Sequence, residues 1–462
     1  MASSSGIAFM LTICGLPALA GYCYLFKQEK QRSRREYAVA EDYQDKHGPI
    51  CQTKLWGRLV AVVTKPLLLT RLENELKVLH TSGPRQEKIC MLTGIADAVR
   101  LTEVMEERMI SITFRELSPN GLLPSGLLTS FDKGLALAFA TAPGHTDFTG
   151  AQNISLSEFV SYSVFYATAF SFFGPKFPVE SHHDFSVLAS NAHLLRSPIS
   201  RWSLVSCKAH AARSAMMKTF SRFIEEWWYA DGLDHIEGIS PLMERVLQAS
   251  KEEELTMEEA AGCLFVLFCD AVTNVTPMSF WAMAHVLKDH SIYRSLRHET
   301  RSQPASHLYG PLLESVVQET LRWAPSPQPT RQAVADADFA LEGKRYRLKA
   351  GTQIVSDMSE YHFDMDLYPQ PQIFQPKRFL SESLPLPRPF GEGKHMCKGM
   401  YLAVFQIKSF ISNTLRSFDL RVMGCRATDT PTENRQQMGS IRALADMGDT
   451  SMDVAISVAR RY

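Results

Sequence analysis

Apolar residues recur at intervals of three and four along most of the chain, the spacing that gathers them on one face of a helix. On this basis residues 158–173 and 211–228 are predicted to be amphipathic or apolar helices. Residues 258–287 form the longest such stretch and are apolar on nearly every face. They are predicted to be one helix of about 30 residues that runs through the middle of a large core.

Polar residues interrupt this long helix halfway along, at Asp270, Thr273, Asn274 and Thr276, and Pro277 follows them. A second membrane span is the alternative interpretation of the stretch. The polar residues would make a span costly unless they line a cavity. A buried helix with polar groups at its centre therefore indicates a functional site.

Short segments with alternating polarity predict a small sheet beside the helices. They lie at residues 47–63 and 332–355, and the second contains turns at Gly343 and Gly351. The predicted fold class is therefore mainly α with a small β portion. The other elements predicted in the C-terminal third are a helix at 311–323, an irregular Pro-rich stretch at 368–389 and a last helix at 397–418.

The N-terminal pattern predicts a transmembrane anchor. Residues 6–26 carry no charge, and these 21 residues are enough to cross the hydrocarbon layer as a helix. Positive charges follow the stretch and none precedes it, which places the rest of the chain on the cytosolic side. A cleaved signal peptide is the alternative, although the basic segment that usually opens one is missing. The predicted parts are an anchor at 1–26, a basic and polar linker at 27–46 and one catalytic domain at 47–462.

Charge and cysteine usage narrow the possible partners. The chain has 49 Lys and Arg against 49 Asp and Glu, so its formal net charge is zero, which argues against a nucleic-acid partner. Its nine cysteines show no repeating spacing, and no cysteine pair or histidine cluster indicates a zinc site. Such unpaired cysteines suggest reduced thiols and a cytosolic catalytic portion.

One cysteine stands in a distinctive setting, the decapeptide FGEGKHMCKG from Phe390 to Gly399. Its glycines permit a tight loop to lie against a flat ligand, and Cys397 is predicted to open an apolar helix whose free N–H groups stabilise a thiolate. Such a thiolate can bind a haem iron. A glycine-rich turn with an idle cysteine is the alternative.

Upstream, Glu319 and Arg322 are spaced to pair on one helix face. This spacing alone is weak evidence, because it arises by chance. Arg378 follows in the segment FQPKRF and could join the pair in a buried network, where several shared hydrogen bonds offset the cost of desolvation. The order of helix pair, proline-spaced arginine, glycine loop and cysteine is hard to obtain by accident.

In that order and at those separations, the segments resemble the cytochrome P450 superfamily of haem-thiolate monooxygenases. The resemblance covers about residues 47–462 and is most secure from residue 258 onward. It implies one large, mostly helical domain, haem b (iron protoporphyrin IX) with Cys397 as its iron ligand, O₂ as a reactant, and electrons from NADPH through a flavoprotein reductase.

By the same resemblance, the long central helix passes over the oxygen-binding side of the haem. Most family members place an acid and an alcohol there, whereas this chain has Thr273 and Asn274. The Asn-x-x-Pro and Phe-Trp arrangement is similar to the branch that holds the sterol hydroxylases of bile-acid synthesis and prostacyclin synthase. The Asn274 amide could orient a dioxygen, a water or a peroxide oxygen.

The resemblance also implies further haem contacts, from the cysteine loop and from Arg331. Phe390, Gly393 and Gly399 belong to the loop motif, and Arg331 matches the place where family members set a cation against a haem propionate. His395 stands where many carry an arginine for the same purpose, unless it only bonds within the loop. The helix that normally contributes a tryptophan and an arginine is not evident. Phe114-Arg115 is a weak candidate for it within a segment, 99–150, that looks shortened.

The predicted function is insertion of one oxygen atom from O₂ into a small apolar, lipid-like substrate, such as a steroid, a terpenoid or a secondary-metabolite intermediate. The predicted place is the endoplasmic reticulum membrane, with a single-pass anchor. The distal pocket is expected at residues 270–277, 326–330 and 436–441. Two alternatives stay open: an isomerase or dehydratase that acts on a peroxide or epoxide without O₂, and a haem-binding protein without turnover.

Overall fold

The structure is a computed structural model that describes residues 49–55, 58–63, 66–122, 125–141, 152–196, 206–230, 236–302, 309–324, 329–341, 344–356, 358–381, 383–423 and 455–460. The predicted anchor, the linker, and residues 326–328 and 436–441 of the expected distal pocket lie outside the described residues. The division into anchor, linker and catalytic domain therefore stays a prediction.

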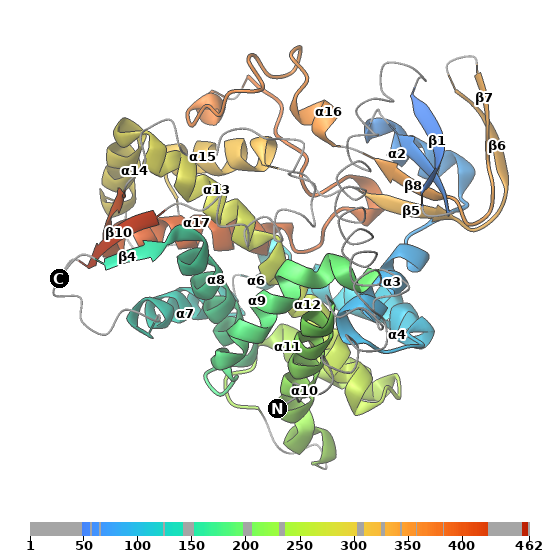
Figure 1. Cartoon of the computed structure of the whole chain (residues 1–462), viewed down its shortest axis with the longest axis horizontal. Helices are drawn as coiled ribbons and strands as arrows, with labels where there is room; N and C mark the ends of the chain where they lie inside the picture. Colours follow the sequence, from blue (N-terminus) through green and yellow to red (C-terminus); the bar gives the residue numbers. More distant parts are fainter. Residues whose placement is uncertain are drawn as a thin grey trace, which may run out of the picture.

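Helices dominate the described part of the chain, which confirms the predicted mainly α class with a small β portion (Figure 1). The expected helices at 158–173, 211–228 and 311–323 correspond to α8 (Leu156–Phe173), α10 (Cys207–Tyr229) and α15 (Pro311–Trp323). The other helices are α2 (Pro66–Leu76), α3 (Ser82–Thr93), α4 (Val99–Val104), a π-helical turn (Met105–Met109), α5 (Ile110–Glu116), α6 (Pro119–Leu122), α7 (Leu127–Thr141), α9 (His182–Asn191), α11 (Pro241–Glu252), α12 (Met257–Thr273), α13 (Val275–Lys288), α14 (His290–Ser302), α16 (Ser359–His362) and α17 (Met400–Ser417), with short 3-10 turns at Val179–Ser181, Ala192–Arg196, Arg378–Leu380 and Gly393–His395.

The predicted central helix is confirmed in its extent, which runs from Met257 to Lys288, but it is irregular at one point. The stretch divides into α12 and α13 at Asn274. Pro277 has no N–H to donate to the carbonyl of Thr273, and its ring crowds that carbonyl, which explains the interruption. At the other end, Thr256 and Glu259 cap α12 by accepting hydrogen bonds from each other's main-chain N–H groups.

Helices α12 and α13 lie in the protein core, as their burial shows. Within the described residues, Met257–Lys288 is long and apolar enough to cross a membrane, but 67% of its most apolar window is buried inside the structure. Its neighbours include α8, α10 and α17. This burial favours the predicted core helix over a second membrane span.

The strands form one main sheet and two smaller ones. The main sheet has the order β1 (Ile50–Leu55), β2 (Arg58–Val63), β8 (Gln353–Ser356), β5 (Thr330–Ala333) and β3 (Leu79–His80), and only β2 and β8 pair in parallel. β6 (Ala337–Leu341) and β7 (Lys344–Leu348) form a hairpin, and β10 (Ala455–Arg460) lies between β4 (Gln152–Ser155) and β9 (Phe418–Val422). These strands confirm the sheet predicted at 47–63 and 332–355.

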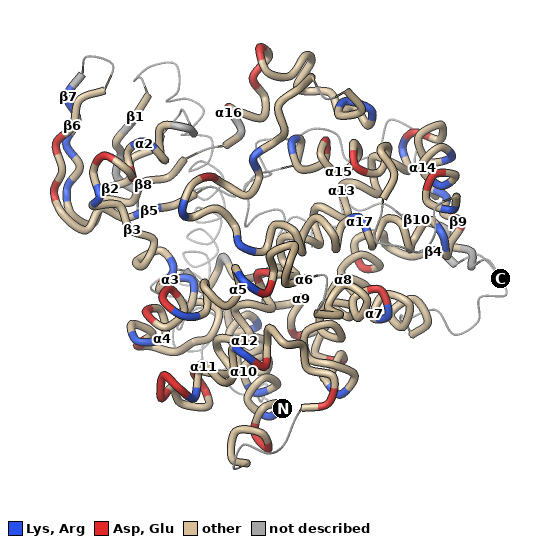
Figure 2. The backbone as a smooth tube through the Cα atoms, turned by 180° about the vertical axis from the view of Figure 1, so that it is seen from behind, with Lys and Arg blue, Asp and Glu red and all other residues tan. Residues whose placement is uncertain are grey.

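The core has two parts. A large cluster of buried side chains joins the helices, and a smaller one lies between α2 and the main sheet. In Figure 1 the main sheet and the β6–β7 hairpin stand at one end of the molecule, and the helices fill the rest. Figure 2 shows acidic and basic residues interspersed along helices such as α14, in keeping with the zero net charge.

Candidate functional site

The loop before α17 carries Cys397, and the structure corrects its predicted setting. Helix α17 begins at Met400, so Cys397 lies in the loop instead of opening the helix. The main-chain N–H of Cys397 donates to the carbonyl of Phe390 at 2.9 Å, which closes the loop. Gly393 has a φ of +65°, and a side chain at that position would be strained. At Gly399, an added Cβ would lie 3.9 Å from the Cys397 sulfur.

The Cys397 sulfur experiences opposing influences. The residue as a whole is solvent-exposed, yet its surroundings desolvate the sulfur enough to raise the pKa of the thiol. The N–H of Gly399 bonds to the sulfur and lowers that pKa, whereas the charge of Asp270 raises it. The Gly399 N–H thus favours the thiolate, as predicted for N–H groups at this position, but desolvation acts more strongly in the opposite direction. A cation that binds the sulfur would have to stabilise the negative charge.

The structure brings Glu319, Arg322 and Arg378 together in the core. Glu319 and Arg322 are fully buried, and Arg378 is only 7% exposed. Arg322 Nε and Nη2 donate to the two Glu319 oxygens at 2.7 and 2.8 Å. Arg378 Nε donates to the same two oxygens at 3.0 and 2.9 Å. Two arginines thus share one carboxylate.

Main-chain carbonyls take up the remaining arginine donors. Arg322 Nη1 donates to the carbonyls of His362 and Pro371 at 2.8 and 2.9 Å, and Arg378 Nη1 donates to Pro369 at 2.6 Å. The network therefore fixes the irregular stretch that leads to the cysteine loop. Such complete hydrogen bonding is what makes a buried ion cluster tolerable.

His362 extends this network toward the loop, a role that the sequence did not reveal. Burial, and then the charge of Arg322, lowers the pKa of His362 to about 3. The neutral ring accepts a hydrogen bond at Nε2 from the main-chain N–H of Arg388, at 2.9 Å. Arg388 in turn forms an ion pair with Glu392 inside the loop. No spacing rule places a histidine here, because the contact depends on the path of an irregular segment.

On the other side of the site, the break between α12 and α13 presents polar groups. Asp270 and Asn274, one turn apart, are exposed halfway along an otherwise buried helix. Thr273 Oγ1 donates to the carbonyl of Cys269 at 2.7 Å, and Asn274 Nδ2 donates to the carbonyl of Asp270 at 3.2 Å. The Asp270 carboxylate forms an ion pair with Lys88 of α3.

Arg331 and His395 converge on a third residue, Glu73 of α2. Arg331 Nε donates to Glu73 Oε1, and His395 Nε2 lies 3.7 Å from the same oxygen. Burial, and then nearby positive charges, lowers the pKa of His395 to about 4, so the ring is neutral at pH 7. Its Nε2 atom is buried and makes no hydrogen bond within the described residues.

These residues fit a haem. Cys397 is an exposed residue close enough to Asp270 for that charge to affect its pKa. Asp270 and Asn274 are exposed on the central helix. The buried Nε2 of His395, 3.7 Å from Glu73, makes no hydrogen bond within the described residues. Arg115 is exposed and pairs with its neighbour Glu116 at 3.2 Å, and its predicted contact with the haem stays a prediction. Phe114 instead lies near the loop, with Lys398 Nζ 5.3 Å from its ring centre.

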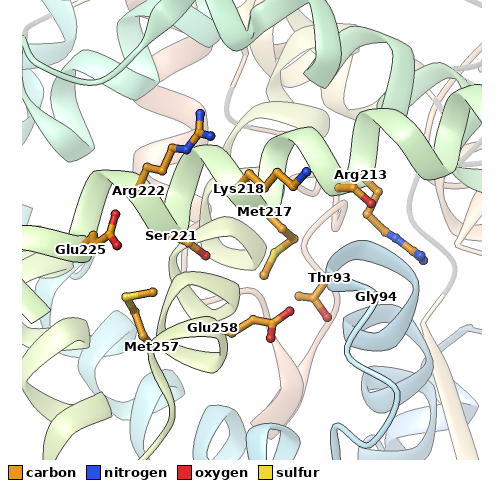
Figure 3. Close-up of a pocket in the computed structure, with 11 residues that line it drawn as sticks. Thr93, Gly94, Arg213, Met217, Lys218, Ser221, Arg222, Glu225, Met257 and Glu258 are labelled. Carbon is orange, nitrogen blue, oxygen red and sulfur yellow. The ribbon is translucent and has the colours of Figure 1, made fainter.

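A separate cleft lies outside this region (Figure 3). It has a volume of about 470 Å³ and lies between α10 and the start of α12, with Thr93 and Gly94 at one end. Glu258 in its wall is 12 residues before Asp270, about 18 Å along the helix. The cleft is therefore distinct from the cysteine loop.

Comparison with known proteins agrees with this geometry. The family model described as Cytochrome P450 matches residues 151–443. The human 7-alpha-hydroxycholest-4-en-3-one 12-alpha-hydroxylase is 27% identical over 226 residues, which cover 42% of this chain and 44% of the relative. The rabbit cytochrome P450 7A1 is 24% identical over 41% of this chain and 44% of its own. Each match thus spans less than half of the relative's length.

A solved structure shares the fold along almost the whole chain. The cyanobacterial CYP120A1 with bound retinoic acid superimposes with a TM-score of 0.68, covering 91% of this chain and 94% of its own. The two are 19% identical in sequence. The likeness therefore concerns the arrangement of helices and strands.

Proposed function

Because this chain belongs to the cytochrome P450 family, we propose that it is a haem-dependent monooxygenase that inserts one oxygen atom from O₂ into an apolar, lipid-like substrate. The observation that carries the proposal is the cysteine loop joined to the network of Glu319, Arg322 and Arg378. The network holds the segment before the loop, and the loop presents one sulfur toward a helix with exposed polar groups.

The loop residues would hold the cofactor. Cys397 would bind the iron of haem b, while Phe390, Gly393 and Gly399 let the loop lie against the flat ring. Arg331 and His395 would face the propionates. When bound, the haem supplies oxygen activation, which a thiolate ligand promotes.

On the facing helix, this chain's own residues would orient the oxidant and hold a proton. Thr273 and Asn274 each bond to a main-chain carbonyl, which fixes their side chains at the break. The Asp270 carboxylate lies one turn before Asn274 and is paired with Lys88. We expect Asp270 Oδ to be the atom that takes up and passes on a proton here, because Thr273 and Asn274 stand in place of the family's acid and alcohol.

The substrate class follows from similarity and location. The sterol 12-alpha-hydroxylase relatives act on steroids according to their names, and the predicted N-terminal anchor would keep the chain at the endoplasmic reticulum membrane. We propose a sterol-like or other lipid-like substrate and electrons from NADPH through a flavoprotein reductase.

The central experiment compares the reduced carbon monoxide difference spectrum of the wild type with that of Cys397→Ser. The wild type is expected to give the thiolate-type Soret band, and the variant to lose it. Cys207→Ser, which alters an exposed free cysteine at the start of α10, is the matched control and should keep the band. A wild-type protein that stays colourless with hemin would contradict the proposal.

Two further candidates differ in what they require. A peroxide or epoxide isomerase is favoured by Asn274 standing where most relatives carry an alcohol, and it would form product without NADPH and reductase. A haem-binding protein without turnover would show the thiolate-type band and oxidise no candidate substrate under reductase supply.

A further inference from the structure

A buried carboxylate lies behind the two residues expected to face the propionates. Glu73 of α2, Arg331 of β5 and His395 of the cysteine loop come from three distant parts of the sequence. Glu73 is 4% exposed and Arg331 is 7% exposed. A single buried charge is costly, so this ion pair must be matched closely.

The hydrogen bonds fix one edge of the Arg331 guanidinium. Its Nε donates to Glu73 Oε1, and its Nη1 donates to the carbonyl of Thr330 at 3.0 Å. Within the described residues no hydrogen bond leaves Nη2. This nitrogen is therefore the donor available to a further acceptor.

The ring of His395, with Nε2 3.7 Å from the same Glu73 oxygen, is the second candidate donor. Its ring stands near Arg331, Arg85, Lys394 and Lys398, all positively charged, with Glu73 as the near anion. The Nε2 atom of this ring is buried and makes no hydrogen bond within the described residues. An incoming carboxylate would then be held by directed donors in a positive surrounding.

We propose that Glu73 is a positioning residue of the haem site, which holds Arg331 by its Nε so that Nη2 and the His395 ring can bind one propionate carboxylate. This inference rests on the proposed function, because the ligand is the haem's own carboxylate. Glu73 itself touches no reacting atom and acts through Arg331.

The test measures how fast the haem-loaded full chain transfers haem to apomyoglobin. Glu73→Gln removes the charge that anchors Arg331 and is expected to speed haem release about 10-fold, as loss of a supporting residue commonly does. Glu75→Gln is the matched control, since Glu75 lies on the same helix but pairs with Arg71 at the surface, and it should release haem at the wild-type rate.

Further variants separate positioning from simple stability. Arg331→Lys keeps a charge for Glu73 but lacks the second donor, so it should release haem as fast as Glu73→Gln. In an Arg331→Gln background, Glu73→Gln should add no further acceleration. Wild-type release from Glu73→Gln or Arg331→Lys would overturn the inference, and slower release from Glu73→Gln would show that Glu73 competes with the propionate.

Failure of the proposed function would be seen in haem uptake by the wild type, whereas failure of the role of Glu73 would be seen only in the variants. If the wild type takes up no haem at all, the function is wrong and the role of Glu73 falls with it. If the wild type binds haem and Glu73→Gln lowers only the denaturant midpoint of the haem-free protein, the ion pair is a structural tie between α2 and β5, and the inference is overturned.

Discussion

Glu319 and Asp270 are two carboxylates near the same candidate site, yet their surroundings differ completely. Glu319 is fully buried and accepts hydrogen bonds from Arg322, Arg378 and the main-chain N–H of Gln375. Asp270 has 45% of its side chain exposed and pairs with Lys88, its one ion-pair partner in the part of the chain that the structure describes. The first environment holds the polypeptide in place, whereas the second leaves a charge available for ligands.

The comparison predicts its largest effect at Glu319. Glu319→Gln leaves two buried arginines without a counter-charge, so the free energy of unfolding should fall by about 3 to 5 kcal/mol. Urea unfolding followed by circular dichroism measures this loss. Glu314→Gln, on the same helix but 43% exposed and paired with Lys408, should change it by less than about 1 kcal/mol. Equal losses in the two variants would remove the contrast between buried and open carboxylates.

The next effect concerns pH and His362, which belongs to the buried network. Its pKa is lowered from 6.5 to about 3, so the unfolded chain takes up a proton well before the folded protein does. The contribution of His362 to the free energy of unfolding is therefore highest above pH 6.5. It decreases by about 1.4 kcal/mol per pH unit as the pH falls from 6.5 toward 3.

His362→Gln removes this titration and keeps an acceptor for the N–H of Arg388. Urea unfolding between pH 7 and pH 4 should therefore show a shallower loss of stability in the variant. Part of the slope will remain, because burial also lowers the pKa of His285 to about 3. Parallel slopes for variant and wild type would mean that His362 is protonated in the folded protein.

The same contrast explains what the sequence could predict. Glu319, Arg322, Arg378 and Cys397 stand in short motifs at fixed separations, because a fully bonded network tolerates little change. The irregularity at Asn274 could not be predicted from Pro277 alone, since a proline can bend a helix without ending it. Glu73 was missed altogether. The apolar spacing of Leu69, Leu72 and Leu76 places Glu73 on the buried face of α2 and Glu75 off it. It does not identify the partner Arg331, which only the packing of α2 on the sheet brings close.

At Asp270, a substitution should affect turnover much more than the free energy of unfolding. Asp270→Asn removes a half-exposed ion pair, so the free energy of unfolding should change by less than about 1 kcal/mol. Under the proposed function, substrate oxidation should fall about 100-fold, because a group that holds a proton is lost. Turnover with NADPH and reductase measures the loss of oxidation, and urea unfolding of the same variant measures the change in stability. Unchanged turnover would leave Asn274 as the residue to examine.

The smallest effect is expected at Lys88, whose only described partner on α12 is Asp270. Lys88→Met retains most of the aliphatic chain and removes the charge, so the coupling energy between the two residues should be between about 0.2 and 1 kcal/mol. A double-mutant cycle of Lys88→Met and Asp270→Asn measures it by urea unfolding. A coupling above about 3 kcal/mol would place the pair in the class of buried networks and erase its difference from Glu319. A small coupling, together with turnover that depends on Asp270 alone, would show that Lys88 only screens a carboxylate that the reaction uses.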